Sequence, residues 1–156
     1  MPVEIERKFL INATSFSAPE GGQEIVQGYL CEEEGRTVRI RLRKGTGTIT
    51  FKGPTKGATR AEFEYEIPAK DVEELLEHCD GRVVRKTRHR ILVGEHTWDV
   101  DIFKGDNAPL LLAEVELESE DEAFERPSWL GEEVTHDGRF ANYSLACSPF
   151  TTWSEP

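Results

Sequence analysis

Apolar and charged residues alternate with a period of two along most of the chain. Such alternation is typical of half-buried β-strands, because successive side chains of a strand point to opposite faces of the sheet. It predicts eight strands, over residues 3–11, 23–31, 37–44, 48–52, 60–67, 84–93, 97–103 and 111–118. Turn sequences such as Gly45-Thr46-Gly47 separate several of them and favour antiparallel connections. The pattern therefore predicts a protein built mainly on antiparallel strands.

A few helices accompany the predicted strands. Apolar residues between positions 72 and 79 recur at the spacing of one helical face, which predicts a helix over 70–79. Ser119 and Glu122 match a capping box and predict a second short helix leading toward Phe124, while residues 139–147 are a candidate third. Consecutive strands with few lateral helices predict an α+β fold. No internal repeat is visible, so residues 1–156 are expected to form a single domain.

Composition and net charge narrow the classes of molecule that this protein is expected to bind. The 156 residues are 37% hydrophobic and 31% charged, which is typical of one globular domain. Nineteen Lys and Arg against thirty Asp and Glu give a net charge of −11, which disfavours nucleic acid as a partner and suits metal cations. The longest apolar run, Leu110 to Ala113, is far too short to cross a membrane. We therefore expect a cytoplasmic protein with no membrane partner and with three reduced cysteines.

The charged residues of six predicted strands share one face within each strand. A single strand of this kind would usually turn its charged face to water. The sets differ in sign, however, and two like charges held about 4 Å apart at a partly buried site repel by roughly 4 kcal/mol. Strands of nearly one sign suit separate binding of a metal and an anion. The main sets are Glu4, Glu6 and Lys8; Arg39, Arg41 and Arg43; Glu62, Glu64 and Glu66; Lys86, Arg88 and Arg90; Asp99 and Asp101; Glu114, Glu116 and Glu118.

Closing about eight strands into a β-barrel leaves an interior that side chains fill or that one small ligand occupies. If the charged faces point inward, arginine and lysine would hold a polyanion and carboxylates would hold Mg²⁺ or Mn²⁺. The apolar faces would then lie outside and need covering. The helix at 70–79, the region of Phe124 and Trp129, the C-terminal segment and a homodimer are candidates to cover them. Trp98 is expected outside, packed under a helix.

The segment Glu4-Ile5-Glu6-Arg7-Lys8 resembles the N-terminal Glu-x-Glu-x-Lys signature of the CYTH superfamily, the triphosphate tunnel metalloenzymes. This family includes inorganic triphosphatases, thiamine triphosphatases and class IV adenylyl cyclases. The resemblance extends over nearly the whole chain and is closest to the short bacterial members. It continues through Gln27-Gly28-Tyr29-Leu30, Arg41-Leu42-Arg43, Thr50-Phe51-Lys52, Arg60-x-Glu62-x-Glu64, Arg85-Lys86-Thr87-Arg88, Asp99-Val100-Asp101, Glu114-Val115-Glu116 and Asp137-Gly138-Arg139-Phe140-x-Asn142.

The resemblance implies an eight-stranded antiparallel triphosphate tunnel with a few lateral helices, which binds a triphosphate end-on with Mg²⁺ or Mn²⁺. The positions that match family phosphate-binding residues are Lys8, Arg41, Arg43, Lys52, Lys86, Arg88 and Arg139. The positions that match metal ligands are Glu4, Glu6, Glu114 and Glu116, with Glu64 and Asp101 as companions. Tyr29 resembles a tyrosine that pairs with the lysine at the position of Lys86. Glu4, Glu6, Tyr29 and Lys86 are the candidate catalytic residues.

The expected activity is metal-dependent hydrolysis of inorganic triphosphate or a related organic triphosphate, with water as the nucleophile. Tyr29 would either donate to the leaving oxygen or position the substrate. The alternatives are a class IV adenylyl cyclase, a thiamine triphosphatase, and a polyphosphate- or nucleotide-binding module without chemistry. The chain offers no obvious base-recognition motif, which favours a small substrate, and the acidic residues expected for metal binding are all present, which favours an enzyme.

Overall fold

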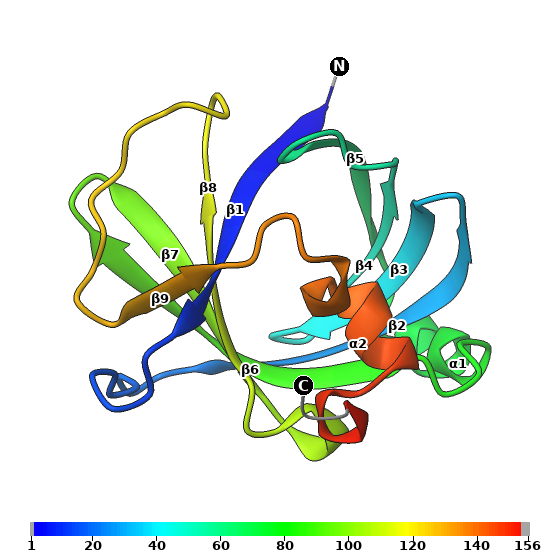
Figure 1. The fold of residues 1–156 in the computed structure, drawn as a ribbon. Helices are drawn as coiled ribbons and strands as arrows, with labels where there is room; N and C mark the ends of the chain where they lie inside the picture. Colours follow the sequence, from blue (N-terminus) through cyan, green and yellow to red (C-terminus); the bar gives the residue numbers. More distant parts are fainter. Residues whose placement is uncertain (1, 154–156) are drawn as a thin grey trace.

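The computed structural model describes residues 2–153, and its strands form a closed ring (Figure 1). The strands are β1 (Val3–Ile11), β2 (Gln23–Glu33), β3 (Arg36–Arg43), β4 (Thr46–Lys52), β5 (Thr59–Ile67), β6 (Val83–Val93), β7 (His96–Phe103), β8 (Leu111–Glu116) and β9 (Leu130–Glu133). Eight of them pair antiparallel in the circular order β1-β5-β4-β3-β2-β6-β7-β8, and β8 returns to β1. The predicted α+β class and the ring of eight antiparallel strands are confirmed, with strand ends within two residues of the predicted ones.

Strand β1 closes the ring. One of its edges pairs with β8, and the other edge pairs with two different strands in turn. Its first half pairs with β5, with Glu4 opposite Arg60, and its second half pairs with β9, with Phe9 opposite Glu133. Between these halves the backbone N–H of Glu6 donates to the carbonyl of Ala58. Strand β9 was not predicted, because its four residues, Leu-Gly-Glu-Glu, show no alternation of apolar and polar positions.

The register of the ring places the charged phase of the strands on the inner face. Lys8 lies opposite Glu114 across β1 and β8, and Arg88 lies opposite Asp101 across β6 and β7. Residues one position out of phase, such as Phe9 and Trp98, belong to an apolar cluster on the other side of the same strands. The charged faces that the alternation predicted therefore point into the ring, as the resemblance to the triphosphate tunnel implied, and the apolar faces point out.

The outer cluster is covered by the segment between β8 and β9. Trp98 is completely buried there and makes edge-on contacts with Phe9, Phe124 and Trp129. The prediction of a helix beginning at Ser119 was wrong, and so was the expectation that Trp98 packs under a helix. The Glu122 carboxylate does accept a backbone hydrogen bond, from Glu118 at 2.6 Å, but only a turn forms, and the residues up to 127 that follow it belong to no helix or strand. A capping box needs a periodic apolar face behind it, and this segment has none.

Helix α1 (Ala69–Glu77) covers the outer face of β2, β3 and β4, close to the predicted range of 70–79. Its close approach requires glycine in the sheet: a Cβ at Gly28 would lie 2.7 Å from Cys79 Sγ, and one at Gly47 would lie 2.6 Å from Val72 Cγ2. A larger residue at either position would push the helix away from the ring.

The C-terminal segment crosses one end of the ring (Figure 1). It contains the short 3₁₀ helices η2 (Gly138–Phe140) and η3 (Phe150–Thr152) and the helix α2 (Asn142–Cys147), while η1 (Gly105–Asn107) lies between β7 and β8. The third candidate helix, over 139–147, is thus divided by the extended residue Ala141. Phe140 and Leu145 pack against Tyr29, Val84, Phe103 and Leu112 in a second apolar cluster. The four strand residues of this cluster face inward, in phase with the charged residues of their strands, so the cluster closes this end of the ring.

Several large apolar side chains remain exposed on the outside, among them Phe51, Tyr65 and Leu92. The homodimer proposed to cover such residues stays a prediction. Within residues 2–153, no helix combines the length and the apolar character required to span a lipid bilayer.

The Arg7–Glu133 pair ties β1 to β9 and gives a pH-dependent contribution to stability. Arg7 donates to both oxygens of Glu133, at 2.7 and 2.8 Å, and this hydrogen bonding lowers the pKa of Glu133 from 4.5 to about 2. Because the folded-state pKa is lowered, the stabilisation is present above pH 4.5 and is lost as the pH falls toward 2. Glu133→Gln should therefore lower the free energy of unfolding at pH 7, and its difference from the wild type should shrink below pH 4.5.

Urea unfolding of both proteins across this pH range measures the effect. Arg7→Gln is the matched control and should lose the same pH-dependent component. A difference that stays constant from pH 7 to pH 3 would contradict this role for the pair.

Candidate active site

The ring encloses a cavity of about 240 Å³. Its lining contains eight basic and seven acidic side chains, although the whole chain carries a net charge of −11. The basic residues are Lys8, Arg39, Arg41, Arg43, Lys52, Arg60, Lys86 and Arg88, and the acidic residues are Glu4, Glu6, Glu62, Glu64, Asp99, Glu114 and Glu116. Positive charge is therefore concentrated inside an acidic protein, which suits an anionic ligand.

The inward-facing charges divide the ring into a mainly acidic arc of β7, β8, β1 and β5 and a mainly basic arc of β4, β3 and β6, with the uncharged lining of β2 between β3 and β6. Ion pairs form between the two arcs. Lys52 Nζ lies 2.9 Å from a Glu4 oxygen and 3.5 Å from Glu62. Arg39 pairs with Glu64 at 3.3 Å. Each strand is nearly single-signed, as the sequence showed, and the folded ring keeps a mainly acidic arc beside a mainly basic one, with ion pairs between the two arcs.

The carboxylates around β1 repel one another. Burial, together with the neighbouring Glu114 and Glu4, raises the pKa of Glu6 well above its usual value. Burial and Glu4 also raise the pKa of Glu116 and of Glu62. Such crowding stores unfavourable charge that a divalent cation would relieve.

The negative charges of two other carboxylates in this group are already compensated by neighbouring cations. Burial alone would raise the pKa of Glu4, but the Lys52 ammonium outweighs it and lowers that pKa. Burial likewise opposes ionisation of Glu114, yet Lys8 and Arg88 hold the pKa of Glu114 at about 2. Both carboxylates are therefore ionised at neutral pH.

The donor chemistry of this group fits Mg²⁺ or Mn²⁺, which prefer carboxylate oxygens. Within residues 2–153, no three His, Cys, Asp or Glu side chains converge closely enough to hold an ion by themselves. Mg²⁺ is commonly held through one or two carboxylates, with substrate phosphates and waters completing its coordination. The residues present therefore fit an ion shared with a phosphorylated ligand.

Lys86, Arg88 and Asp101 form a buried cluster beside the cavity. Lys86 Nζ lies 2.8 Å from Asp101 Oδ2, and Arg88 donates to both Asp101 oxygens at 2.7 and 2.9 Å. Burial lowers the pKa of Lys86 to about 7, although Asp101 opposes the shift. The two cations more than offset the effect of burial on Asp101 and hold its pKa well below the usual value.

Two of the predicted site residues do not line the cavity. Asp101 is fully buried behind the lining, and both of its oxygens serve cations, so in this arrangement it neutralises Lys86 and Arg88 instead of presenting a free oxygen to a metal. Arg139 is exposed, pairs with Asp137 at 2.7 Å and lies over the rings of Phe140 and Trp153. The other predicted residues are brought together by the ring.

The arginines of β3 are crowded with other cations. Burial, then Arg39 and Arg88, lowers the pKa of Arg41 to about 9. Arg39 is 6% exposed, and its Nε has no hydrogen-bond partner among the described residues. A buried donor of this kind is costly unless an acceptor arrives, and a phosphate oxygen is such an acceptor.

Gln27 and Asn142 are members of the site that sequence reasoning did not assign. Gln27 Nε2 lies 3.1 Å from Tyr29 Oη and 3.1 Å from Asn142 Oδ1, and Lys86 Nζ donates to the same Asn142 oxygen at 2.8 Å. The implied pair of Tyr29 and Lys86 is therefore connected through two amides. The signal for Gln27 was its phase with Tyr29 on one strand, whereas the position of Asn142 depends on the crossing of the C-terminal segment.

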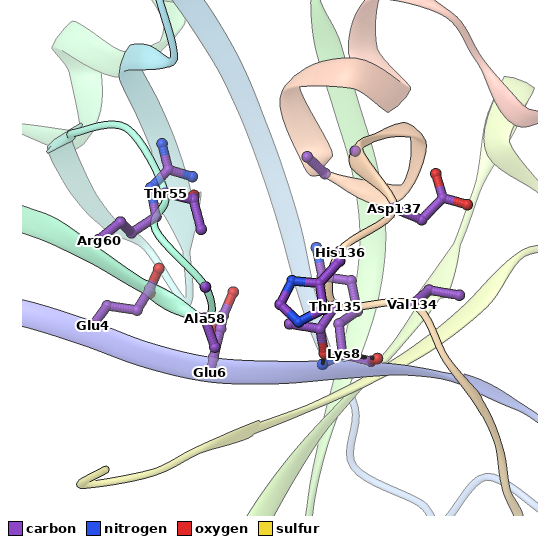
Figure 2. A pocket seen from close by; sticks show the side chains of 13 residues that line it. Glu4, Glu6, Lys8, Thr55, Ala58, Arg60, Val134, Thr135, His136 and Asp137 are labelled. Atoms are coloured by element: carbon purple, nitrogen blue, oxygen red, sulfur yellow. Dashed lines mark hydrogen bonds between the residues drawn. The ribbon is translucent and has the colours of Figure 1, made fainter. Parts of the chain in front are cut away.

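A second opening reaches the same residues through the wall of the ring (Figure 2). This pocket of about 340 Å³ lies where β1 exchanges β5 for β9, and it shares Glu4, Glu6, Lys8 and Arg60 with the central cavity. Figure 2 shows Thr55 and Arg60 on one side and His136 and Asp137 on the other. The Lys8 backbone N–H donates to the Thr135 hydroxyl at 2.9 Å, which anchors the second side to β1.

Comparison with known proteins agrees with this geometry. The family model described as the CYTH domain matches residues 2–142. The chain is a member of the CYTH family. This CYTH protein is 37% identical over 156 residues to an inorganic triphosphatase of Acetivibrio thermocellus, covering 99% of the chain and 100% of the relative. It is 40% identical to an inorganic triphosphatase of Nitrosomonas europaea, covering 93% of the chain and 97% of the relative.

A crystal structure described as that of an inorganic triphosphatase superposes on this CYTH protein with a TM-score of 0.68. The two chains are 37% identical, and the match covers 93% of this chain and 98% of the other. The fold and the charged interior are therefore both consistent with membership of the CYTH family.

The carboxylate of Asp101 should be essential for stability, because it is the counter-charge shared by the buried Lys86 and Arg88. Asp101→Asn leaves Lys86 and Arg88 without their shared counter-charge, and breaking a buried ion pair typically costs about 3–5 kcal/mol. Asp99→Asn is the matched control on the same strand, because the Asp99 side chain is 29% exposed. Chemical denaturation should show a large loss for Asp101→Asn and a small one for Asp99→Asn. Equal losses would contradict the assignment.

Proposed function

We propose that this CYTH protein is a divalent-metal-dependent inorganic triphosphatase. The observation that carries the proposal is the cavity of about 240 Å³, lined by eight basic and seven acidic side chains inside a protein of net charge −11. A small ligand with many negative charges complements the basic residues, and an ion shared with it complements the crowded carboxylates. The named relatives, at 37% and 40% identity, support the same activity.

In this proposal the basic residues bind and align the triphosphate. They are Lys8, Arg41, Arg43, Lys52, Lys86 and Arg88, with Arg39 added because its buried Nε has no partner among the described residues. Guanidinium groups give forked contacts to phosphate oxygens, whereas lysines supply compact charge. Because Arg139 is exposed and paired with Asp137, it is left out of this set.

Glu4, Glu6, Glu114 and Glu116 would hold Mg²⁺ or Mn²⁺, with Glu64 as a companion. When bound, the ion would neutralise phosphate charge and lower the pKa of a water. Asp101 is left out of this set because its oxygens serve Lys86 and Arg88. Glu6 or a neighbouring carboxylate would orient the attacking water, and Lys86 and Tyr29 would bind the phosphate chain at the closed end of the ring.

The other activities of the family have less support. An adenylyl cyclase or a thiamine triphosphatase would need a surface for an organic group, and the sequence offers no base-recognition motif. A binding module without chemistry would not need the acidic residues, yet Glu4, Glu6, Glu114 and Glu116 all line the cavity. We further expect the protein to act in the cytoplasm on a small-molecule triphosphate and not on nucleic acid.

A panel of substrates tests the proposed activity. The purified protein should release phosphate from tripolyphosphate with Mg²⁺ or Mn²⁺ and should lose this activity in EDTA. ATP, thiamine triphosphate and pyrophosphate should be poorer substrates. Appearance of cyclic AMP from ATP would favour the cyclase, and tight binding without phosphate release would favour the binding module.

Substitutions should separate the acidic from the basic part of the site. Glu6→Gln should remove most turnover, because it removes a carboxylate from the crowded group that would hold the metal. Lys8→Ala should mainly raise the KM for tripolyphosphate, because it removes one of the bases that bind it. Steady-state kinetics across a metal titration measures both effects.

Glu66→Gln is the control for these variants. Glu66 shares the charged phase of β5, but it is exposed and does not line the cavity, so its substitution should leave kcat and KM unchanged. Full turnover by Glu6→Gln at every metal concentration would contradict the role given to the carboxylates.

A further inference from the structure

Gln27 at the closed end of the cavity has an orientation that its neighbours dictate. Arg41 Nε donates to Gln27 Oε1 at 2.9 Å. A guanidinium group has donors and no acceptor, so the oxygen of the Gln27 amide must face Arg41. The amide NH₂ must then face the other way, toward Tyr29 Oη and Asn142 Oδ1, each at 3.1 Å.

The same reasoning fixes Asn142, the first residue of α2. Lys86 Nζ lies 2.8 Å from Asn142 Oδ1, and in its ammonium form, which the adjacent Asp101 carboxylate favours, this group can only donate. The Asn142 oxygen must therefore face Lys86, where it also accepts from the Gln27 NH₂. Both amides are thus oriented by neighbours that have no acceptor, and the two assignments agree with each other.

This network determines what Tyr29 and Lys86 can offer to a ligand. Tyr29 Oη accepts from Gln27, so its single hydrogen is free to point elsewhere, and neither Arg41 nor Lys86 can accept it. Lys86 gives one N–H to Asn142 and one to Asp101, at 2.8 Å each, which leaves one of its three. Tyr29 and Lys86 both line the cavity.

We propose that Gln27 and Asn142 are positioning residues that hold the Tyr29 hydroxyl and the remaining Lys86 N–H as donors to oxygens of the bound triphosphate. Gln27 is completely buried and Lys86 is 1% exposed, so water does not readily replace these contacts. The C-terminal segment thereby closes the end of the ring and also prepares its donors. This inference rests on the proposed function for the identity of the ligand.

A double-mutant cycle on Gln27 and Tyr29 tests the first half. Gln27→Glu keeps the shape but places an oxygen where the NH₂ was, so Tyr29 would donate to that oxygen and not to the ligand. Tyr29→Phe should weaken tripolyphosphate binding about tenfold, the effect of losing one hydrogen bond to a charged group. The factor by which Gln27→Glu raises the Kd for tripolyphosphate should be about ten times smaller in the Tyr29→Phe background than in the wild type, because the Tyr29 donor is then already absent.

A second cycle, Asn142→Leu with Lys86→Ala, tests the other amide and does not depend on the folding of Gln27→Glu. Asn142→Leu should weaken binding about tenfold in the wild type and much less when Lys86 is already alanine. If Asn142 only stabilises the fold, Asn142→Leu should raise Kd by the same factor in both backgrounds, because that effect does not involve the Lys86 donor. Thermal unfolding identifies any variant that does not fold.

Calorimetry with tripolyphosphate in EDTA gives Kd for each cycle, and phosphate release with Mg²⁺ gives kcat/KM. Coupling in both cycles is the expected result, and additivity in either one overturns the role of that amide. If the wild type binds tripolyphosphate without releasing phosphate, the proposed function fails while the Kd cycles still decide this inference. If it neither binds nor releases phosphate, both are overturned.

Discussion

Charge compensation between side chains of different strands allows this ring to exist with a polar interior. Burying an isolated charge is prohibitively costly, whereas a charge with a close partner and hydrogen bonds is tolerated. Lys52 with Glu4 and the pair of Lys86 and Arg88 with Asp101 are such arrangements. Compensation is incomplete at Glu6, Arg41 and Lys86, whose pKa values are shifted toward the neutral forms. Under the proposed function, a metal ion and a phosphate chain would relieve the uncompensated charge at these sites.

The two ends of the interior differ because the inward phase of the strands changes character along its length. At one end Tyr29, Phe103 and Leu112 are apolar and meet Phe140 and Leu145 from the C-terminal segment. Toward the other end the same phase carries carboxylates and bases that a solvent-filled cavity can accommodate. The C-terminal segment therefore does more than seal the ring. Its Phe140 carbonyl accepts from Lys8 at 3.1 Å, and its Asn142 amide accepts from Lys86, so it contacts two strands of the site at once.

Much of the site could be predicted because a strand repeats every two residues. Once the alternation was recognised, membership of one face followed for Glu4, Glu6 and Lys8 without any knowledge of the fold. Helix α1 was predictable for the same reason, since its apolar face recurs at helical spacing. The wrong helix after Ser119 arose from a local hydrogen-bonding signal that no apolar periodicity supported. Strand β9 was missed because pairing with the edge of β1, and not its own residues, makes it a strand.

The sequence by itself determined the class of fold, the side of each strand that bears charge and the family, because these depend on local periodicity and on residue types at fixed spacing. Only the tertiary structure decided which charges meet. It paired Asp101 with two cations, turned Arg139 out toward Asp137 and brought Asn142 to Lys86 from 56 residues away. Contacts between distant segments depend on ring closure, register and the path of the C-terminal segment, and none of these is encoded in the period of a single strand.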